Sequence, residues 1–127
     1  MIDVDRFKAV NDANGHQVGD AVLVEIARRL AAGVRGDDVV ARLGGDEFVI
    51  LFASDHPDAQ RACERIADTV ARRPVHHDGN VAVLTSLSCG IAPWRPGMAP
   101  ADLIGAADLA LYAAKRGGRN CVRAATG

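Results

Sequence analysis

Apolar side chains recur at every third or fourth position in three long stretches of the chain, and this spacing predicts three amphipathic helices. The first is expected over about residues 17–33. The second follows a helix cap at Ser54 or Asp55, and the third covers residues 100–117, where glycine ends it. Each helix has one apolar face, so each needs another layer to cover it.

Shorter apolar runs without helical spacing lie between these helices and predict strands. Two of them, residues 39–43 and 48–52, are separated by four glycine or acidic residues and predict a β-hairpin. Helices interleaved with an antiparallel hairpin predict an α+β fold, in which helices pack on a mixed sheet. The other expected elements are a strand end at residues 1–4, a helical turn at 7–12, a long strand at 81–92 and an edge strand at 121–123.

Composition narrows the function classes. A chain of 127 residues predicts one domain, and 15 basic against 16 acidic residues leave no basic excess for a general nucleic-acid binder. The three cysteines, Cys63, Cys89 and Cys121, stand apart in apolar stretches and are expected to be buried thiols in a reducing compartment. Neither a signal peptide nor an apolar run long enough to span a bilayer is present, so we expect a cytoplasmic domain without membrane contact.

The connection between the hairpin strands reads Gly44-Gly45-Asp46-Glu47. A polar turn is the ordinary interpretation of Gly-Gly-Asp, and it leaves the two adjacent carboxylates unexplained. Glycines let another group approach bare backbone, and paired acids are typical ligands of a hard cation that carries phosphate. The tip of the hairpin therefore predicts a metal and phosphate site.

A second candidate is the stretch from Asp3 to Asp12, in which a strand end carrying acids runs into a helical turn that contains Lys8. The free backbone N–H groups of such a turn favour an anion. An aspartate at a strand-to-helix junction is also an ordinary helix cap. Together with Asp46 and Glu47, however, Asp3 would complete the one or two carboxylates that Mg²⁺ with phosphate typically needs.

The run Gly44-Gly45-Asp46-Glu47-Phe48 resembles the signature of the GGDEF family, the diguanylate cyclases, and residues 3–12 resemble the family's first motif. The resemblance implies a central, mostly antiparallel five-stranded sheet like that of nucleotide cyclases and the polymerase palm. It also implies Mg²⁺ or Mn²⁺ as cofactor and two facing copies that join two GTP molecules into cyclic di-GMP.

The same resemblance implies roles for individual residues. Asp3, the Val4 carbonyl and Asp46 would hold the metal, and Glu47 would assist the metals or help deprotonate the attacking hydroxyl. The guanine edge would be read by Asn11 and Asp20. The phosphates would be held by the backbone of Arg6 and Phe7, by Lys8, Lys115 and Arg119, and beside Gly44 and Gly45.

An inhibitory product site is implied at Arg35 and Asp38, with Arg65 as a weaker second clamp. Without the resemblance, this loop is only charged and Arg65 is an exposed helix arginine. Lys115 would be an ordinary basic residue of a last helical turn, and Asp20 an acid in a first turn. These alternatives stay open at the level of the sequence.

The chain departs from the family at its start, because it begins almost at Asp3 and lacks the family's leading Asp-x-Leu-Thr-Gly-Leu motif. We therefore expect a single GGDEF domain over residues 1–127 that is truncated at its N-terminus. A sensor domain is the expected partner in a full-length protein. The alternatives to an active cyclase are a module that only binds cyclic di-GMP and an inactive fragment of a longer signalling protein.

Overall fold

The computed structural model describes residues 1–126, so Gly127, the last residue of the expected domain, lies outside the described part. Its main sheet has five strands in the order β2-β3-β1-β6-β7, and only β6 and β7 run parallel. The expected mostly antiparallel five-stranded sheet is confirmed. These strands are β1 (Ile2–Val4), β2 (Val39–Gly44), β3 (Glu47–Leu51), β6 (Leu87–Ile91) and β7 (Cys121–Ala124).

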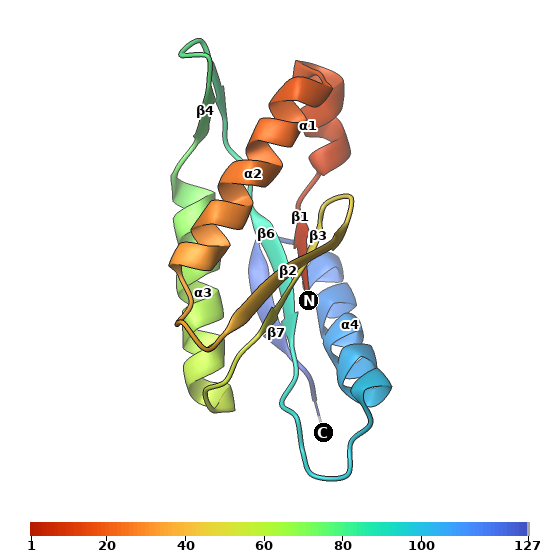
Figure 1. Cartoon of the computed structure of the whole chain (residues 1–127). Helices are drawn as coiled ribbons and strands as arrows, with labels where there is room; N and C mark the ends of the chain where they lie inside the picture. The colour runs from red at the N-terminus through yellow and green to blue at the C-terminus, as the bar shows by residue number, and fades with distance from the viewer. Residues whose placement is uncertain (127) are drawn as a thin grey trace.

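Helices cover both faces of this sheet (Figure 1). On one side lie α2 (His16–Ala32) and α3 (His56–Arg72), and on the other lies α4 (Pro100–Arg116). The short helix α1 (Phe7–Asn14) stands at one end of the sheet, beside the tip of the β2–β3 hairpin. The three long helices therefore begin and end close to the residues that their apolar spacing predicts.

Side chains alternate across β1, which is paired on both sides. Ile2 and Val4 are almost fully buried in the core formed with α2 and α3. Asp3 lies between them in the chain and therefore points to the opposite face, where α4 packs. This alternation explains how one three-residue strand contributes both to the apolar core and to a polar site.

One glycine sets how closely α4 approaches the sheet. A Cβ built on Gly90 of β6 would lie 2.1 Å from the Leu111 backbone nitrogen and 2.3 Å from the Ala107 carbonyl oxygen. Only a residue without a side chain allows this contact between the backbones of strand and helix. The close approach brings the C-terminal end of α4, which carries Lys115, next to β1.

The structure corrects several expectations. The long strand at 81–92 is wrong, because the chain leaves the strand conformation between β5 (Val81–Val83) and β6, and β5 forms a separate two-stranded sheet with β4 (Val75–His77), which the apolar pattern missed. The turn at 7–12 is a full eight-residue helix. Asp20 lies in the second turn of α2, whose first turn holds no acid.

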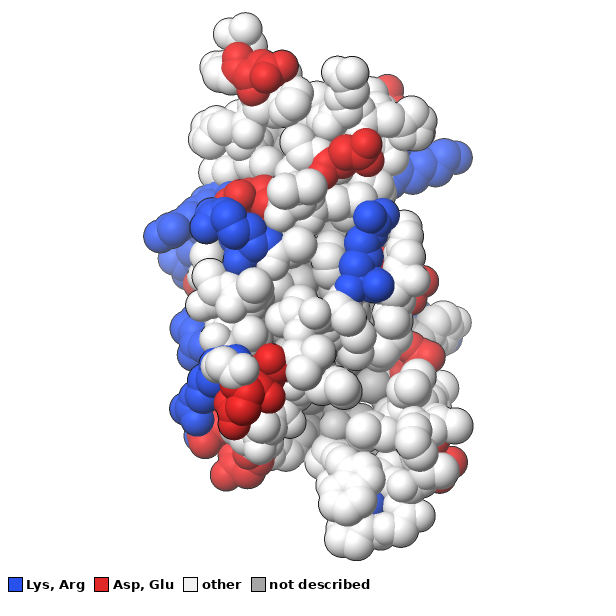
Figure 2. All heavy atoms as spheres, in the orientation of Figure 1, with Lys and Arg blue, Asp and Glu red and all other residues white. Residues whose placement is uncertain are grey.

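Surface charge is mixed in sign. In the view of Figure 2, Lys and Arg gather along the edge formed by α2 and α3, with Asp and Glu among them. Arg28 and Arg29 pair with Glu25, for example, and Arg61 pairs with Asp58. Within residues 1–126, no helix is both long and apolar enough to cross a membrane. Of the three free cysteines, Cys63 and Cys89 are buried as expected, whereas Cys121 is partly exposed.

Candidate metal and nucleotide site

Asp3, in the middle of β1, is a buried acid, with 7% of its surface exposed. One carboxylate oxygen, Oδ2, forms an ion pair with the Lys115 ammonium of α4. The other, Oδ1, is buried and has no hydrogen-bond partner. A buried carboxylate oxygen left without a partner is costly, so this atom marks a place that a cation would satisfy.

The hairpin brings its acids to Asp3. Glu47 is the direct cross-strand partner of Asp3, and the Val4 N–H donates to the Asp46 carbonyl oxygen at 3.1 Å. Side chains of directly paired residues lie on one face, about 5 Å apart at Cβ. Gly45 has a left-handed φ of 51°, which permits the tight turn into Asp46. The sheet register therefore brings together the two acidic segments that the sequence separates by more than forty positions.

These groups fit a divalent cation that also binds phosphate. Within residues 1–126 no three side chains of His, Cys, Asp or Glu converge as a complete metal-binding group. Mg²⁺ in nucleotide sites usually takes only one or two carboxylates and completes its shell with water and phosphate oxygens. Asp3, with its unpartnered oxygen, Asp46 and the Val4 carbonyl are suited to that role.

The start of α1 offers backbone donors to an anion. Arg6, which precedes the helix, has a left-handed φ of 53°, and no side chain caps the first turn. The N–H groups of this turn are therefore free of a side-chain acceptor, and Lys8 in the same turn is exposed. A phosphate group is the natural partner for such an uncapped helix start.

Asn11 of α1 and Asp20 of α2 also lie near each other. A Cβ built on Gly19 would be 1.7 Å from Asn11 Oδ1, so α1 packs directly on the glycine that precedes Asp20. Asn11 Oδ1 is buried without a hydrogen-bond partner, and Asp20 is exposed. The pair thus presents polar groups where α1 packs against the N-terminal half of α2.

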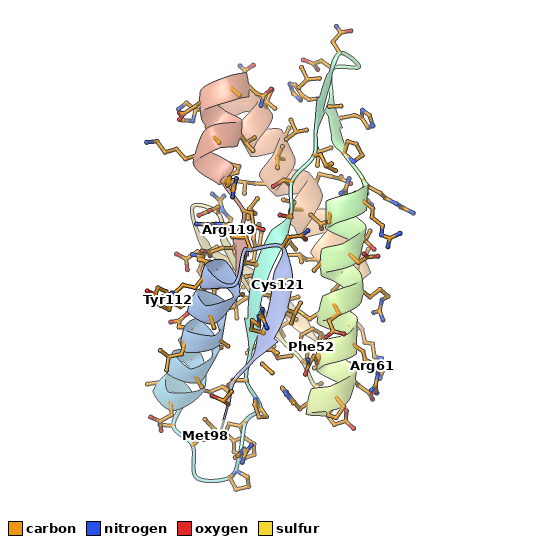
Figure 3. All side chains as sticks on the ribbon, turned by 180° about the vertical axis from the view of Figure 1, so that it is seen from behind. Phe52, Arg61, Met98, Tyr112, Arg119 and Cys121 are labelled. Atoms are coloured by element: carbon orange, nitrogen blue, oxygen red, sulfur yellow. The ribbon has the colours of Figure 1, made fainter. Side chains whose placement is uncertain are left out.

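Lys115 and Arg119 are placed differently. Lys115 contacts Asp3, whereas Arg119 follows the end of α4 where the chain turns into β7 (Figure 3). Arg119 lines a hollow of about 530 Å³ together with Arg6 and Asn14, and neither Asp3 nor Lys115 belongs to its lining. The two cations that the resemblance assigns to one triphosphate therefore have different surroundings, Lys115 at Asp3 and Arg119 at the hollow beside Arg6.

The expected product site lies at the base of the hairpin. The Asp38 carboxylate accepts from the backbone N–H groups of Ala53 and Arg35, at 2.8 Å each, and these bonds lower the pKa of Asp38. Arg65 of α3 donates to the Gly33 carbonyl at 3.0 Å. Arg35 and Arg65 are both exposed, and the contact of Arg65 with the end of α2 places it near the Arg35 loop.

Asp5 is a buried acid near the candidate site to which sequence reasoning assigned no role. The residue is 8% exposed, and its carboxylate accepts from the hydroxyls of Ser86 and Ser88 and from the Asn120 N–H. Asp5 stands two residues after Asp3, and this spacing was the available signal, because in an extended chain it puts both acids on one face. Its partners come from distant segments, which no local pattern identifies.

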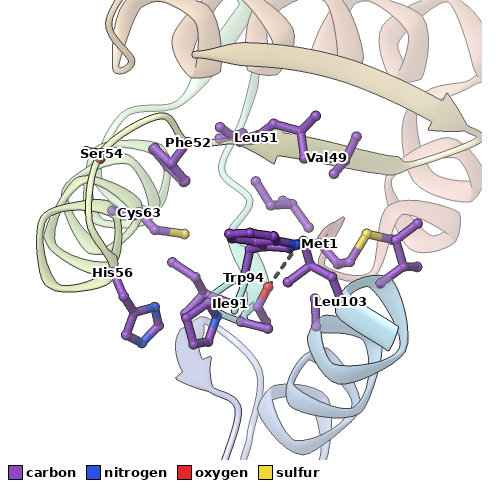
Figure 4. Close-up of a pocket in the computed structure, with 18 of the residues that line it drawn as sticks. Met1, Val49, Leu51, Phe52, Ser54, His56, Cys63, Ile91, Trp94 and Leu103 are labelled. Atoms are coloured by element: carbon purple, nitrogen blue, oxygen red, sulfur yellow. Dashed lines mark hydrogen bonds between the residues drawn. The ribbon is translucent and has the colours of Figure 1, made fainter. Parts of the chain in front are cut away.

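A second hollow lies away from the acidic residues of the candidate site. A hollow of about 540 Å³ opens at the Met1 end of β1, between β3, α3 and α4, and its lining is mostly apolar (Figure 4). The Met1 amino group at its edge donates to the Gly90 carbonyl at 2.9 Å, and burial lowers the pKa of this amine. Apolar walls offer little to a triphosphate, so the acidic end of β1 is the better nucleotide candidate.

An α+β sheet with two carboxylate segments, an uncapped helix start and a lysine at one end is the arrangement expected of a domain that binds nucleotide phosphates through a metal ion. The family model described as "Diguanylate cyclase, GGDEF domain" matches residues 1–121. The chain therefore belongs to the GGDEF family.

Relatives with known names agree with this assignment. Diguanylate cyclase TpbB of Pseudomonas aeruginosa is 44% identical over 128 residues, which cover 98% of this chain and 29% of TpbB. The crystal structure of the TpbB GGDEF domain matches with a TM-score of 0.91 and 45% identity, covering 99% of this chain and 80% of that one. The GGDEF domain of DgcB from Caulobacter crescentus, in complex with c-di-GMP, also has a TM-score of 0.91, at 35% identity, covering 97% and 74%. The chain thus spans less than a third of the length of TpbB.

Proposed function

We propose that this domain is a diguanylate cyclase, which condenses two GTP molecules into cyclic di-GMP and two pyrophosphates. The observation that carries the proposal is Asp3, whose buried Oδ1 has no partner while its Oδ2 pairs with Lys115, directly across the sheet from Glu47. The family assignment and the relatives named diguanylate cyclases support the same reaction.

Asp3, Asp46 and the Val4 carbonyl would hold Mg²⁺ or Mn²⁺, which when bound supplies positive charge to the triphosphate and acidifies the attacking hydroxyl. The uncapped start of α1 at Arg6, Phe7 and Lys8 binds phosphate oxygens through backbone N–H groups. Bare backbone at Gly44 and Gly45 leaves room for the nucleotide beside the hairpin. Lys115 and Arg119 add the remaining positive charge to the phosphates.

Base selectivity is assigned to Asn11 and Asp20. A carboxylate that accepts from the N1 and N2 donors of guanine discriminates against adenine, which lacks this pair of donors. The exposed Asp20 and the half-buried Asn11, whose Oδ1 has no hydrogen-bond partner, suit a base that enters between α1 and α2.

The chemical step is a displacement at phosphorus. The 3′-hydroxyl of one GTP attacks the α-phosphate of the other, the bond to the β-phosphate oxygen breaks, and pyrophosphate leaves. The hydroxyl proton passes to Glu47 or to solvent. Because one domain holds one GTP, a second copy must face it, and the step occurs twice to close the ring.

Product inhibition is proposed at Arg35 and Asp38, with Arg65 as the second clamp. The arginines would grip product phosphates and guanine, and Asp38 would accept from the base. The DgcB structure in complex with c-di-GMP supports product binding by a domain of this fold. A sensor domain in a longer protein is the proposed source of the input signal, and the GTP substrate and free thiols favour a cytoplasmic location.

Chromatography of the products formed from GTP and Mg²⁺ tests the proposal. The expected result is cyclic di-GMP and two equivalents of pyrophosphate, with loss of both in Asp46→Ala and retention in the matched control Asp68→Ala, an exposed acid on α3. Absence of product from the wild-type chain, at concentrations that allow pairing, overturns the cyclase. Binding of cyclic di-GMP without turnover would instead support a receptor module.

A further inference from the structure

Asp5 is a buried carboxylate that lacks a counter-ion. It follows β1 directly, its carboxylate contacts Ser88, the cross-strand partner of Asp3, and only 8% of the residue's surface is exposed. Among residues 1–126, no lysine, arginine or histidine forms an ion pair with it. Burying a charge in this way is costly unless several hydrogen bonds stabilise it.

Three donors from two distant segments meet the Asp5 carboxylate. Ser86 Oγ donates to Oδ2 at 2.6 Å, Ser88 Oγ donates to Oδ1 at 2.5 Å, and the Asn120 backbone N–H donates to Oδ2 at 3.0 Å. The Asp5 backbone is held as well, since its N–H donates to the Ser86 carbonyl and its carbonyl accepts from the Thr85 hydroxyl. Asp5 therefore joins the end of β1, the start of β6 and the turn that follows α4.

The segments on either side of this carboxylate have strained backbones. Arg6, the next residue in the chain, has a φ of 53°, and Arg119 and Asn120 have φ values of 63° and 47°. Left-handed conformations of residues other than glycine persist only where the surroundings enforce them, and they cluster at functional sites. The hydrogen bond from the Asn120 N–H to Asp5 holds Asn120 directly in this conformation, and Arg6 is the covalent neighbour of Asp5.

We propose that Asp5 is a positioning residue that fixes the start of α1, beginning at Arg6, relative to the 117–120 turn that carries Arg119. The inference rests on the proposed function, because it takes these two segments as the walls of the triphosphate site. Arg6 and Arg119 line one hollow, with Asp5 and Asn120 also in its lining. Asp5 does not touch the nucleotide; it holds the groups that do.

Hydrogen exchange tests the contact without any nucleotide. In the wild-type chain the Asn120 amide is expected to exchange slowly although it lies in a turn, and in Asp5→Ala its exchange should accelerate at least about 10-fold, because the acceptor is gone. The control Asp102→Ala removes the acceptor of the Ala99 N–H at the opposite end of α4 and should leave Asn120 protected. Fast exchange at Asn120 in the wild type would overturn the proposal even if Asp5→Ala fails to fold.

Calorimetry tests whether Asp5 affects nucleotide binding. The ligand is α,β-methylene GTP with Mg²⁺, because the reacting bond of this analogue cannot break. Asp5→Ala should weaken binding at least about 10-fold, and Asp5→Asn by no more than about 3-fold, because its carbonyl oxygen can accept from Ser86 and Asn120 while its amide donates to Ser88. Asp102→Ala lowers the melting temperature without changing this affinity. Equal loss in Asp5→Asn and Asp5→Ala would contradict the role of the hydrogen bonds.

A double-mutant cycle separates positioning from general destabilisation. If Asp5 acts through the turn, adding Arg119→Ala to Asp5→Ala should weaken binding by no more than about a further 2-fold. If the two residues act independently, the affinity losses of the two single variants should multiply. Wild-type affinity in Asp5→Ala overturns this inference and leaves the cyclase intact. Failure of the wild type to bind the analogue at all overturns the cyclase, while the Asn120 exchange still reports on Asp5.

Discussion

The two ends of β1 are built in opposite ways. At the Asp3 end, a carboxylate, a lysine and an acidic hairpin converge, and hydrogen bonds fix the chain around Asp5. At the Met1 end, apolar side chains from β3, α3 and α4 surround a hollow of about 540 Å³. One end of this short strand therefore carries the candidate catalytic groups, and the other end contributes to the stability of the fold. Substitutions at the acidic end should change turnover at nearly constant stability, and substitutions at the apolar end should do the reverse.

Asp46→Ala should give the largest effect. Its side chain has no hydrogen-bond or ion-pair partner among those found within residues 1–126, while its backbone holds Val4. Removing a proposed metal ligand should lower the rate of cyclic di-GMP formation by at least about 100-fold. Product formation and a urea titration on the same sample check this. A large fall in the urea midpoint would mean that the activity was lost through unfolding, and would contradict the expected separation between the two ends of β1.

Ile91→Ala tests the apolar end. Ile91 of β6 is 8% exposed and lines the hollow, so the change removes buried methyl groups without touching the acids. The expected loss of stability is about 2–4 kcal/mol. Denaturant unfolding measures it, and KM for GTP in the folded fraction should stay within about 2-fold of wild type. Leu109→Ala, at an exposed position of α4, serves as the control.

Gly90→Ala should change both the stability of the fold and the binding of GTP. Because a Cβ at Gly90 would meet the α4 backbone, the helix must move outward or the strand must shift. We expect a loss of about 1–3 kcal/mol of stability and, since Lys115 moves with α4, a higher KM for GTP. Gly105→Ala, at an open position of the same helix, should do neither. An unchanged KM in Gly90→Ala would mean that the position of Lys115 does not depend on this packing.

The smallest effect concerns Asp38, whose carboxylate binds the N–H of Ala53 at the edge of the apolar hollow. The Ala53 and Arg35 N–H groups lower its pKa below the usual value of 3.8. A depressed folded-state pKa means that its contribution to stability is present above 3.8 and is lost as the pH falls through the folded-state pKa. Carboxyl NMR titration should find this pKa below 3.8, and a value above it would contradict the two hydrogen bonds.

Local chemistry made much of the fold predictable. The apolar spacing in α2, α3 and α4 identified each long helix because its buried face is made of residues close in sequence. Asp55 was one of two expected caps for α3, and its side chain does accept from the Asp58 N–H at 3.0 Å. The same approach failed at residues 81–92, because an apolar run does not reveal that Leu84 is exposed and that the chain changes sheets there.

The candidate site, like the fold, was predictable from the sequence only in part. The sequence by itself determined the residue types, namely the acids of the hairpin, Asp3, and the basic end of α4, since their motif and order are local. Only the tertiary structure decided that Asp3 faces Glu47 and Lys115, that Gly90 allows α4 so close, and that Asp5 binds Asn120. The physical reason is that strand register and helix packing join residues from distant parts of the chain, such as Asp5 and Asn120, and no periodicity in the chain records such pairings.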